Sequence, residues 1–213
     1  MRWRSVILAV VLAAGACPAL TVDELVAKSR QVLDGVKDFT CTMTFSVRAP
    51  DVRVPDTRSK ILFKQPDKCK AKPLDGDFAV LPRVWRMAVG QVLARLAETH
   101  RLTLLREEEV QDRRQGVLKA EPKQEDREHI AYHLLWVDAE RGTLTRVRTY
   151  PRQGTPVNID LSHTQRGKAW LPERVVAAGR EPKAEGKGDE EVRVTLRFGD
   201  YRVNVGLSDD EFK

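Results

Sequence analysis

The sequence predicts a mainly β fold in which a strongly curved antiparallel sheet is covered by an N-terminal helix and a central helix. Apolar and polar side chains alternate over residues 38–47, as in a strand with one buried face. In the closing stretch, residues 190–212, apolar side chains fall on even positions before Gly199-Asp200 and on odd positions after it. Such a change of parity indicates a β-bulge, which bends a strand. Two further segments, 21–37 and 83–99, carry apolar residues at helical spacing.

The composition is that of a single soluble-type domain. The chain has 213 residues, of which 41% are hydrophobic and 32% are charged, enough apolar material for one core. The net charge is +6, and it falls to +4, from 35 basic and 31 acidic residues, without Arg2 and Arg4 in the leader segment. This small excess, with no long basic run, argues against a nucleic-acid-binding protein and is compatible with a modest attraction to an anionic membrane surface.

The first nineteen residues are expected to be a signal peptide, followed by one domain over residues 20–213. Arg2 and Arg4 precede the apolar run 6–14, and small residues up to Ala19 offer a cleavage site. The run is shorter than the roughly 20 apolar residues of a membrane span. Cys17 keeps an alternative open, because bacterial lipoproteins are cleaved and acylated at such a cysteine. We expect export to the periplasm, as a soluble protein or with a lipid anchor at Cys17.

The N-terminal part of the mature chain is expected to form one helix and a three-stranded meander. Thr21, with Glu24 three residues later, forms a capping box, and the apolar stripe that follows predicts a helix ending near Lys37. Strands are expected at 38–47, 60–64 and 68–72. Pro66 belongs in the turn before the third strand, because proline cannot donate a ladder hydrogen bond.

A second amphipathic helix is predicted over residues 83–99. Trp85, Val89 and Leu93 lie on its apolar stripe. Two interpretations stay open. The helix either packs permanently on the sheet as part of the core, or acts as a movable lid whose apolar stripe covers a cavity.

Alternation returns after His100. Strands are expected at 102–106, 116–121, 130–137, 144–150, 156–162 and 169–177, before the closing strand. Turn signals separate them at spacings that suit antiparallel hairpins. The charged segment 180–189 is expected to be a solvated hairpin tip.

No catalytic or metal-binding motif stands out in the sequence. It contains no Gly-x-Ser-x-Gly elbow, no Gly-rich phosphate loop and no Cys-x-x-Cys. His129 and His133 would meet on a helix, but their apolar neighbours indicate a strand, where four residues span about 13 Å. Cys41 and Cys69 either pair in an oxidising compartment or stay separate on different strands. The sequence therefore predicts a protein that is not an enzyme and that uses no cofactor or metal.

The order of the segments resembles the LolA-like family of bacterial outer-membrane lipoprotein-sorting proteins, together with the related LolB and RseB-type domains. The resemblance rests on short stretches that occur in the same order: Leu62-Phe63-Lys64-Gln65-Pro66, residues 132–138, Leu171-Pro172, and the tail 207–212. It covers nearly all of the mature chain.

The resemblance implies an unclosed half-barrel of about eleven strands with helices as a lid. It implies a monomeric periplasmic carrier that shields acyl chains of lipoproteins or lipids during transfer toward the outer membrane, with an inner-membrane donor complex and an outer-membrane acceptor as partners. Two alternatives stay open: an RseB-like lipid-sensing regulatory module, and a lipid-anchored acceptor similar to LolB. The family's carriers hold the lid closed with an arginine just before the proline of the second strand. This chain has Gln65 there and so departs from the family at the position of the latch.

Strand parity and the resemblance together predict the residues that bind lipid. We expect the cavity to be lined and roofed by Met43, Phe45, Val47, Ile61, Phe63, Trp85, Val89, Leu93, Leu134, Trp136, Val194 and Leu196.

Overall fold

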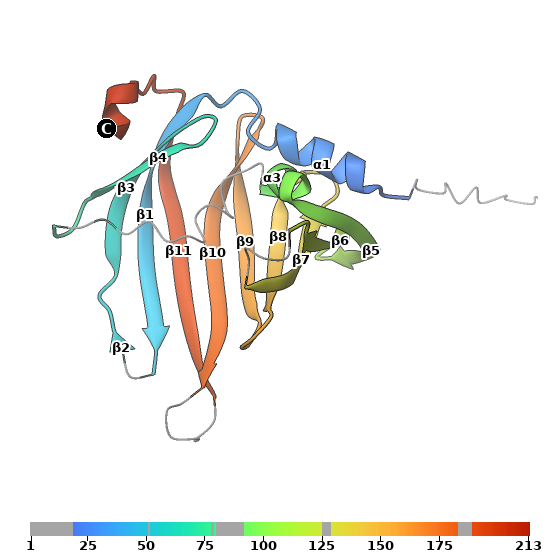
Figure 1. Cartoon of the computed structure of the whole chain (residues 1–213). Helices are drawn as coiled ribbons and strands as arrows, with labels where there is room; N and C mark the ends of the chain where they lie inside the picture. The colour runs from blue at the N-terminus through green and yellow to red at the C-terminus, as the bar shows by residue number, and fades with distance from the viewer. Residues whose placement is uncertain (1–18, 51, 78, 80–91, 125–128, 183–188) are drawn as a thin grey trace, which may run out of the picture.

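The computed structural model describes residues 19–50, 52–77, 79, 92–124, 129–182 and 189–213. Within them, eleven strands form one antiparallel sheet that is not closed into a barrel (Figure 1). The strand order is β4-β3-β1-β11-β10-β9-β8-β7-β6-β5, and β2 pairs with β1 beside this path. The predicted fold class is confirmed, as is the β1-β3-β4 meander.

The elements have the following bounds. The strands are β1 (Asp38–Ala49), β2 (Val52–Arg53), β3 (Thr57–Lys64), β4 (Lys68–Pro73), β5 (His100–Val110), β6 (Arg113–Pro122), β7 (Ile130–Asp138), β8 (Leu144–Pro151), β9 (Val157–Arg166), β10 (Ala169–Pro182) and β11 (Asp189–Val203). The helices are α1 (Val22–Gln31), α3 (Val92–Thr99) and the 3-10 helix η1 (Asp209–Phe212). The first part of the predicted helix 83–99 and most of the tip 180–189 lie outside the described residues.

Helix α1 starts as predicted and ends earlier than predicted. Thr21 caps it, and both hydrogen bonds of the capping box with Glu24 are present. The helix ends at Gln31 rather than near Lys37, because the chain turns where Gly35 adopts φ +77°. The apolar stripe continues through this turn, since Val36 is buried although it is not helical. The sequence pattern thus reports burial correctly and overestimates the helix length.

The bulge predicted at Gly199-Asp200 is present in β11. Thr40 pairs with Arg202 and Thr42 with Gly199, so one residue of β1 faces two residues of β11. Asp200 has φ +53°, the left-handed conformation that often accompanies such an insertion. The strand then ends at Val203, before the last apolar positions of the alternating stretch.

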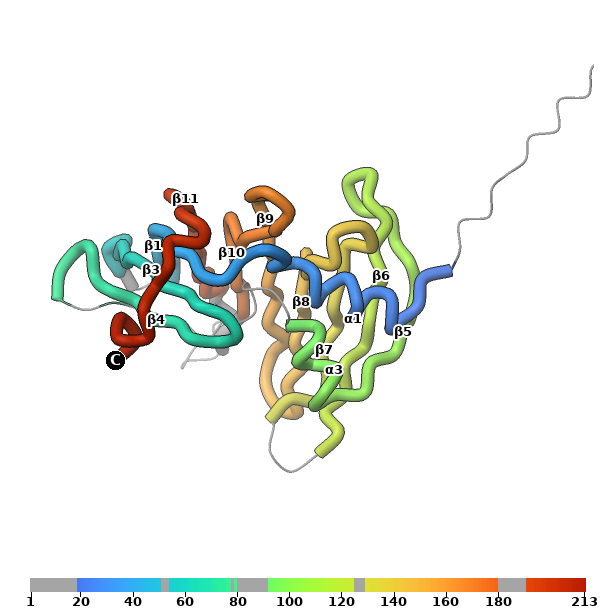
Figure 2. The backbone as a smooth tube through the Cα atoms, turned by 90° about the horizontal axis from the view of Figure 1, so that it is seen from above, coloured from blue at the N-terminus to red at the C-terminus, as the bar shows by residue number. Residues whose placement is uncertain are grey.

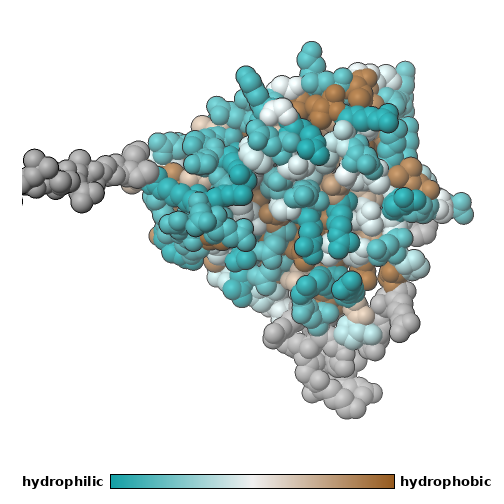
Figure 3. All heavy atoms as spheres, turned by 180° about the vertical axis from the view of Figure 1, so that it is seen from behind, coloured by the Kyte–Doolittle hydropathy of each residue, from teal (hydrophilic) through white to brown (hydrophobic). Residues whose placement is uncertain are grey.

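The sheet has two distinct faces. The inner face carries the core side chains and is covered by α1 and α3, which also contact each other (Figure 2). Leu25 from α1 and Leu93 from α3 are buried in the same cluster as Leu118 and Leu135 of the sheet. The outer face is the opposite side, which is hydrophilic over most of its surface in the rear view of Figure 3.

The two cysteines form no disulfide. Cys41 lies on β1 and Cys69 on β4, and β3 runs between these strands. Cys41 lies opposite Ile61 and Cys69 opposite Phe63, so two strand spacings and an offset of two residues place the Cα atoms more than about 10 Å apart. That separation exceeds the roughly 7 Å within which a disulfide can form without backbone movement. The alternative with separate thiols is therefore the correct one.

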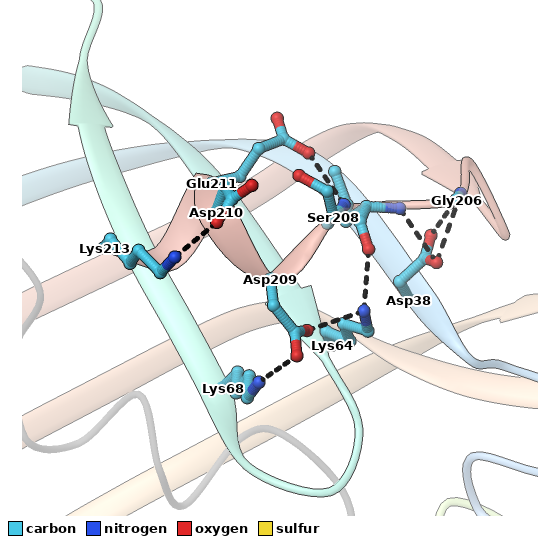
Figure 4. A network of polar contacts seen from close by, with 10 residues as sticks. Asp38, Lys64, Lys68, Gly206, Ser208, Asp209, Asp210, Glu211 and Lys213 are labelled. Atoms are coloured by element: carbon cyan, nitrogen blue, oxygen red, sulfur yellow. Dashed lines mark hydrogen bonds and ion pairs between the residues drawn. The ribbon is translucent and has the colours of Figure 1, made fainter.

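The chain after β11 returns to the sheet at a buried carboxylate (Figure 4). Asp38 is 4% exposed and accepts hydrogen bonds from the backbone N–H groups of Val205 at 2.7 Å and of Gly206 and Leu207 at 3.2 Å. The tail thus has a fixed position against β1.

Two lysines hold the tail a few residues further on (Figure 4). Lys64 Nζ donates to the carbonyl oxygen of Leu207 at 2.9 Å, and both Lys64 and Lys68 lie 2.8 Å from carboxylate oxygens of Asp209. Hydrogen bonds from these two lysines lower the pKa of Asp209 to about 2. The tail, which the sequence marks only as a short motif, is an integral part of the fold.

Candidate functional site

Apolar side chains line the inner face of the central strands and lie opposite one another in the register. The cross-strand pairs of β1 and β11 on this face are Met43–Phe198, Phe45–Leu196 and Val47–Val194. On β3, Ile61 lies beside Cys41, and Phe63 stacks on Phe39 with 4.9 Å between ring centres.

The apolar row continues across the neighbouring strands. The pairs are Val175–Leu196 and Ala177–Val194 between β10 and β11, Leu161–Val175 and Ile159–Ala177 between β9 and β10, and Val147–Ile159 between β8 and β9. No polar side chain interrupts the row from Val47 through Val194, Ala177 and Ile159. We call this row and the one beside it, which contains Phe45 and Leu196, the apolar strip.

Burial decreases along the apolar strip toward the end of the sheet that carries the β10–β11 hairpin. Met43 and Leu196 have no exposed surface. Phe45, which lies opposite Leu196, is partly exposed, as are Val47 and Val194 one pair closer to that end. A ligand with an apolar chain can therefore contact this end of the strip without displacing the buried core.

Three titratable side chains of the inner face, Cys41, His100 and His133, are buried. The described residues contain no group of three side chains suited to hold a metal ion. Burial raises the pKa of the Cys41 thiol to about 12, so this thiol stays protonated. The rings of His100 and His133 lie 5.6 Å apart, and His133 Nδ1 is 2.9 Å from Thr149 Oγ1. What the face offers is apolar contact.

Comparisons with known proteins connect this geometry to a fold. No family model and no curated protein matches the sequence. A DUF1329 family protein from Desulfovibrio piger is similar in structure, with a TM-score of 0.63 and 15% identity, over 90% of this chain and 95% of that one. A LolA superfamily protein from Nitrosomonas europaea matches with a TM-score of 0.56 and 16% identity, over 92% and 98% of the two chains.

A third structure, an outer membrane lipoprotein-sorting protein domain from Vibrio parahaemolyticus, matches with a TM-score of 0.58 and 14% identity over 90% and 95% of the two chains. The chain has the fold of the LolA superfamily. The resemblance seen in the sequence is thereby confirmed at the level of the fold. None of the described helices is long and apolar enough to cross a membrane.

The LolA fold brings most of the predicted lining residues together. Seven of them share the inner face: Met43, Phe45, Val47, Ile61, Phe63, Val194 and Leu196. Leu93 of α3 is buried in the same core cluster, which agrees with the interpretation of this part of the helix as core. Trp85 and Val89 lie outside the described residues.

The placement of Leu134 and Trp136 on the inner face is wrong. On β7 the odd-numbered residues Leu135 and Val137 join the core cluster, so the even-numbered ones point to the outer face. There Trp136 Nε1 donates a hydrogen bond to Glu108 at 2.9 Å. This strand is apolar at both parities, and alternation alone could not select the correct one.

Some residues of the apolar strip were missed in the sequence. Val175, Ala177, Ile159 and Leu161 lie in the strip although they were not expected to line the cavity. The signal that could have found Ile159 and Leu161 is the alternation within residues 157–161, which is as regular as that of residues 38–47. Val175 and Ala177 lie in a continuous apolar run, where alternation gives no such signal.

Gln65 occupies the position where the resemblance places an arginine, and it makes a contact of its own. Its side-chain Nε2 donates to the carbonyl oxygens of Val36 and Leu33, and its backbone N–H donates to the carbonyl oxygen of Lys37 at 2.9 Å. In this LolA fold an uncharged amide therefore ties the β3–β4 turn to the turn that follows α1.

Proposed function

We propose that the protein is a periplasmic, non-enzymatic carrier that shields the acyl chains of lipoproteins or lipids on its inner face. The observation that supports this most is the apolar strip, which reaches partly exposed positions at one end of an unclosed sheet. Because β4 and β5 are not joined to each other, the sheet can open and close around a ligand without breaking its ladders.

The transfer would be physical rather than chemical. Burial of a methylene group contributes about 0.8 kcal/mol, so about ten methylenes on the strip would contribute about 8 kcal/mol. A chain bound in this way is held out of water without a covalent bond and passes to an acceptor with a better apolar site. Phe45, Val47 and Val194 would make the first contacts, and Leu93 of α3 would belong to the roof. A donor complex in the inner membrane and an acceptor in the outer membrane are the partners that this role requires.

The bound ligand itself provides the test. The exported chain is produced in a bacterial host, purified without detergent and extracted with organic solvent, and acyl species are identified by mass spectrometry. We expect acyl species with the wild-type protein and a clear decrease with Val47→Asn and Val194→Asn. Val176→Asn is the matched control, because it makes the same change on the outer face of β10, next to inner-face residues. Repeated absence of acyl species from folded wild-type protein would overturn the proposal.

The mass of the mature N-terminus separates two forms of the carrier. A diacylated Cys17 indicates an anchored acceptor, whereas a chain that starts at a free Leu20 or a free Cys17 indicates a soluble shuttle.

A further inference from the structure

Four arginines gather around a pocket on the outer face, on the opposite side of the sheet from the apolar strip. Arg48 of β1, Arg174 of β10, and Arg193 and Arg197 of β11 line a cavity of about 380 Å³. Ser46 and Thr195 lie in the same lining, together with the carboxylate residue Asp56 and three apolar residues, Val47, Ala49 and Val54. We call this cavity the arginine pocket.

The strand register explains how residues from distant parts of the chain form the arginine pocket. Arg48 lies directly opposite Arg193, and Arg197 lies directly opposite Arg174. Between these two arginine pairs, Ser46 lies opposite Thr195. Like charges directly opposite each other on neighbouring strands are destabilising. The sheet contains two such pairs side by side, with two hydroxyl groups between them.

Negative groups of the chain neutralise this charge only in part. Arg193 pairs with Glu191, with 2.7 Å between Nη2 and Oε1. Within the described residues, the side chains of Arg48, Arg174 and Arg197 make no ion pair or hydrogen bond, and all three residues are exposed. The pocket therefore has four guanidinium groups against one lining carboxylate.

We propose that the arginine pocket binds a phosphate group, carried by an anionic phospholipid head group or by a soluble phosphate ester. Guanidinium groups match phosphate oxygens in a two-point geometry, and serine and threonine hydroxyls donate further hydrogen bonds. A bound anion would also remove the repulsion within the two arginine pairs. The arginines and the two hydroxyl residues have the opposite strand parity from the apolar strip, and Val47 alone belongs to both linings, so this proposal does not depend on the acyl-carrier function.

Two double variants test the pocket in solution. Arg174→Gln/Arg197→Gln removes one arginine pair, and Arg148→Gln/Arg202→Gln removes two exposed arginines of the outer face that do not line the pocket. Thermal unfolding is measured with inorganic phosphate and with chloride at the same ionic strength. Phosphate stabilises folded proteins in general, because it is excluded from their surface. We therefore expect phosphate to raise Tm of the wild type and of the control variant by a similar amount, and to raise Tm of the pocket variant by less. In chloride the pocket variant should unfold no earlier than the wild type.

Sedimentation with vesicles distinguishes the two sources of phosphate. Phosphatidylglycerol–phosphatidylcholine vesicles are compared with phosphatidylcholine vesicles. If a lipid head group is the ligand, binding to the phosphatidylglycerol vesicles falls at least tenfold in the pocket variant and less than threefold in the control. A smaller phosphate response in the pocket variant without vesicle binding assigns the pocket to a soluble phosphate ester. Equal losses in both double variants, or no response of the wild type in either assay, would overturn the proposal.

Discussion

Replacement of Asp38 by alanine should detach the C-terminal tail and cost a large part of the folding free energy. The Asp38 carboxylate is 4% exposed and accepts hydrogen bonds from three consecutive backbone N–H groups of the tail. A hydrogen bond to a charged group contributes about 1.5–3 kcal/mol, so three of them would sum to about 5–9 kcal/mol. The loss is smaller than this sum, because the N–H groups regain water when the tail leaves. We expect about 3–4 kcal/mol for Asp38→Ala and about 2 kcal/mol for Asp38→Asn, which keeps one acceptor oxygen.

Urea unfolding at pH 7, followed by tryptophan fluorescence, measures this loss. The control is the same substitution in a chain truncated after Asn204, which lacks all three N–H donors. There Asp38→Ala should cost less than about 1 kcal/mol, since the carboxylate no longer has tail groups to hold. The reasoning is refuted if Asp38→Ala costs the same in both backgrounds, or less than about 1 kcal/mol in the full chain.

Three further predictions concern Asp209, Gln65 and the bulge of β11. The lowered pKa of Asp209, about 2, means that its pairs with the lysines stabilise the tail fully above about pH 4 and are lost as the pH falls toward 2; protection of the tail amides from hydrogen exchange, relative to the intrinsic rate at each pH, should fall over this range, and Asp209→Asn should show low protection already at pH 6. Gln65→Ala should lower the free energy of unfolding by about 1 kcal/mol and speed amide exchange at residues 33–37, because the hydrogen bond to Val36 is lost. Gln65→Arg keeps side-chain donors, so its free energy of unfolding should stay near that of the wild type. Equal losses in both variants would contradict the contact with Val36. Asp200→Val should cost about 1–2 kcal/mol in thermal or urea unfolding, because a β-branched residue tolerates φ +53° poorly. Gly199→Val should cost less, since an added Cβ meets no atom within 4 Å, and the reverse order would show that the strained residue of the bulge is misassigned.

The strands could be predicted because most of them have one buried and one solvated face. Residues 192–198 and 157–161 alternate for this reason, and the register places them where the alternation suggests. β7 could not be oriented in the same way. Its outer face is also apolar, since Trp136 is only 9% exposed there, so both parities fit the sequence. The predicted end of α1 was wrong for a related reason: several residues after Gln31 are buried without being helical, so they continue the apolar pattern of the helix.

Sites that depend on which strands pair could not be predicted from the sequence. Arg48 and Arg174 lie far apart in the chain, and their common pocket exists because β11 pairs with both β1 and β10. The contact of Asp38 with the tail likewise joins residues at the two ends of the domain. The apolar strip was easier, because each strand contributes its own alternating residues and any curved sheet would collect them on one side.

The position of β11 also sets the order in which the molecule can be completed. Among the described strands, the β1–β11 ladder is the link between the β4-β3-β1 meander and the series from β5 to β10. Phe39 of the first strand pairs with Val203 of the last, so this ladder closes the longest loop in the chain. A chain that emerges N-terminus first, from a ribosome or through a membrane, therefore holds two unjoined sheets until its final strand arrives. The apolar faces of these two sheets are exposed to aggregation until β11 pairs with β1. We therefore expect the final folding step to be slow and to follow synthesis of the whole chain.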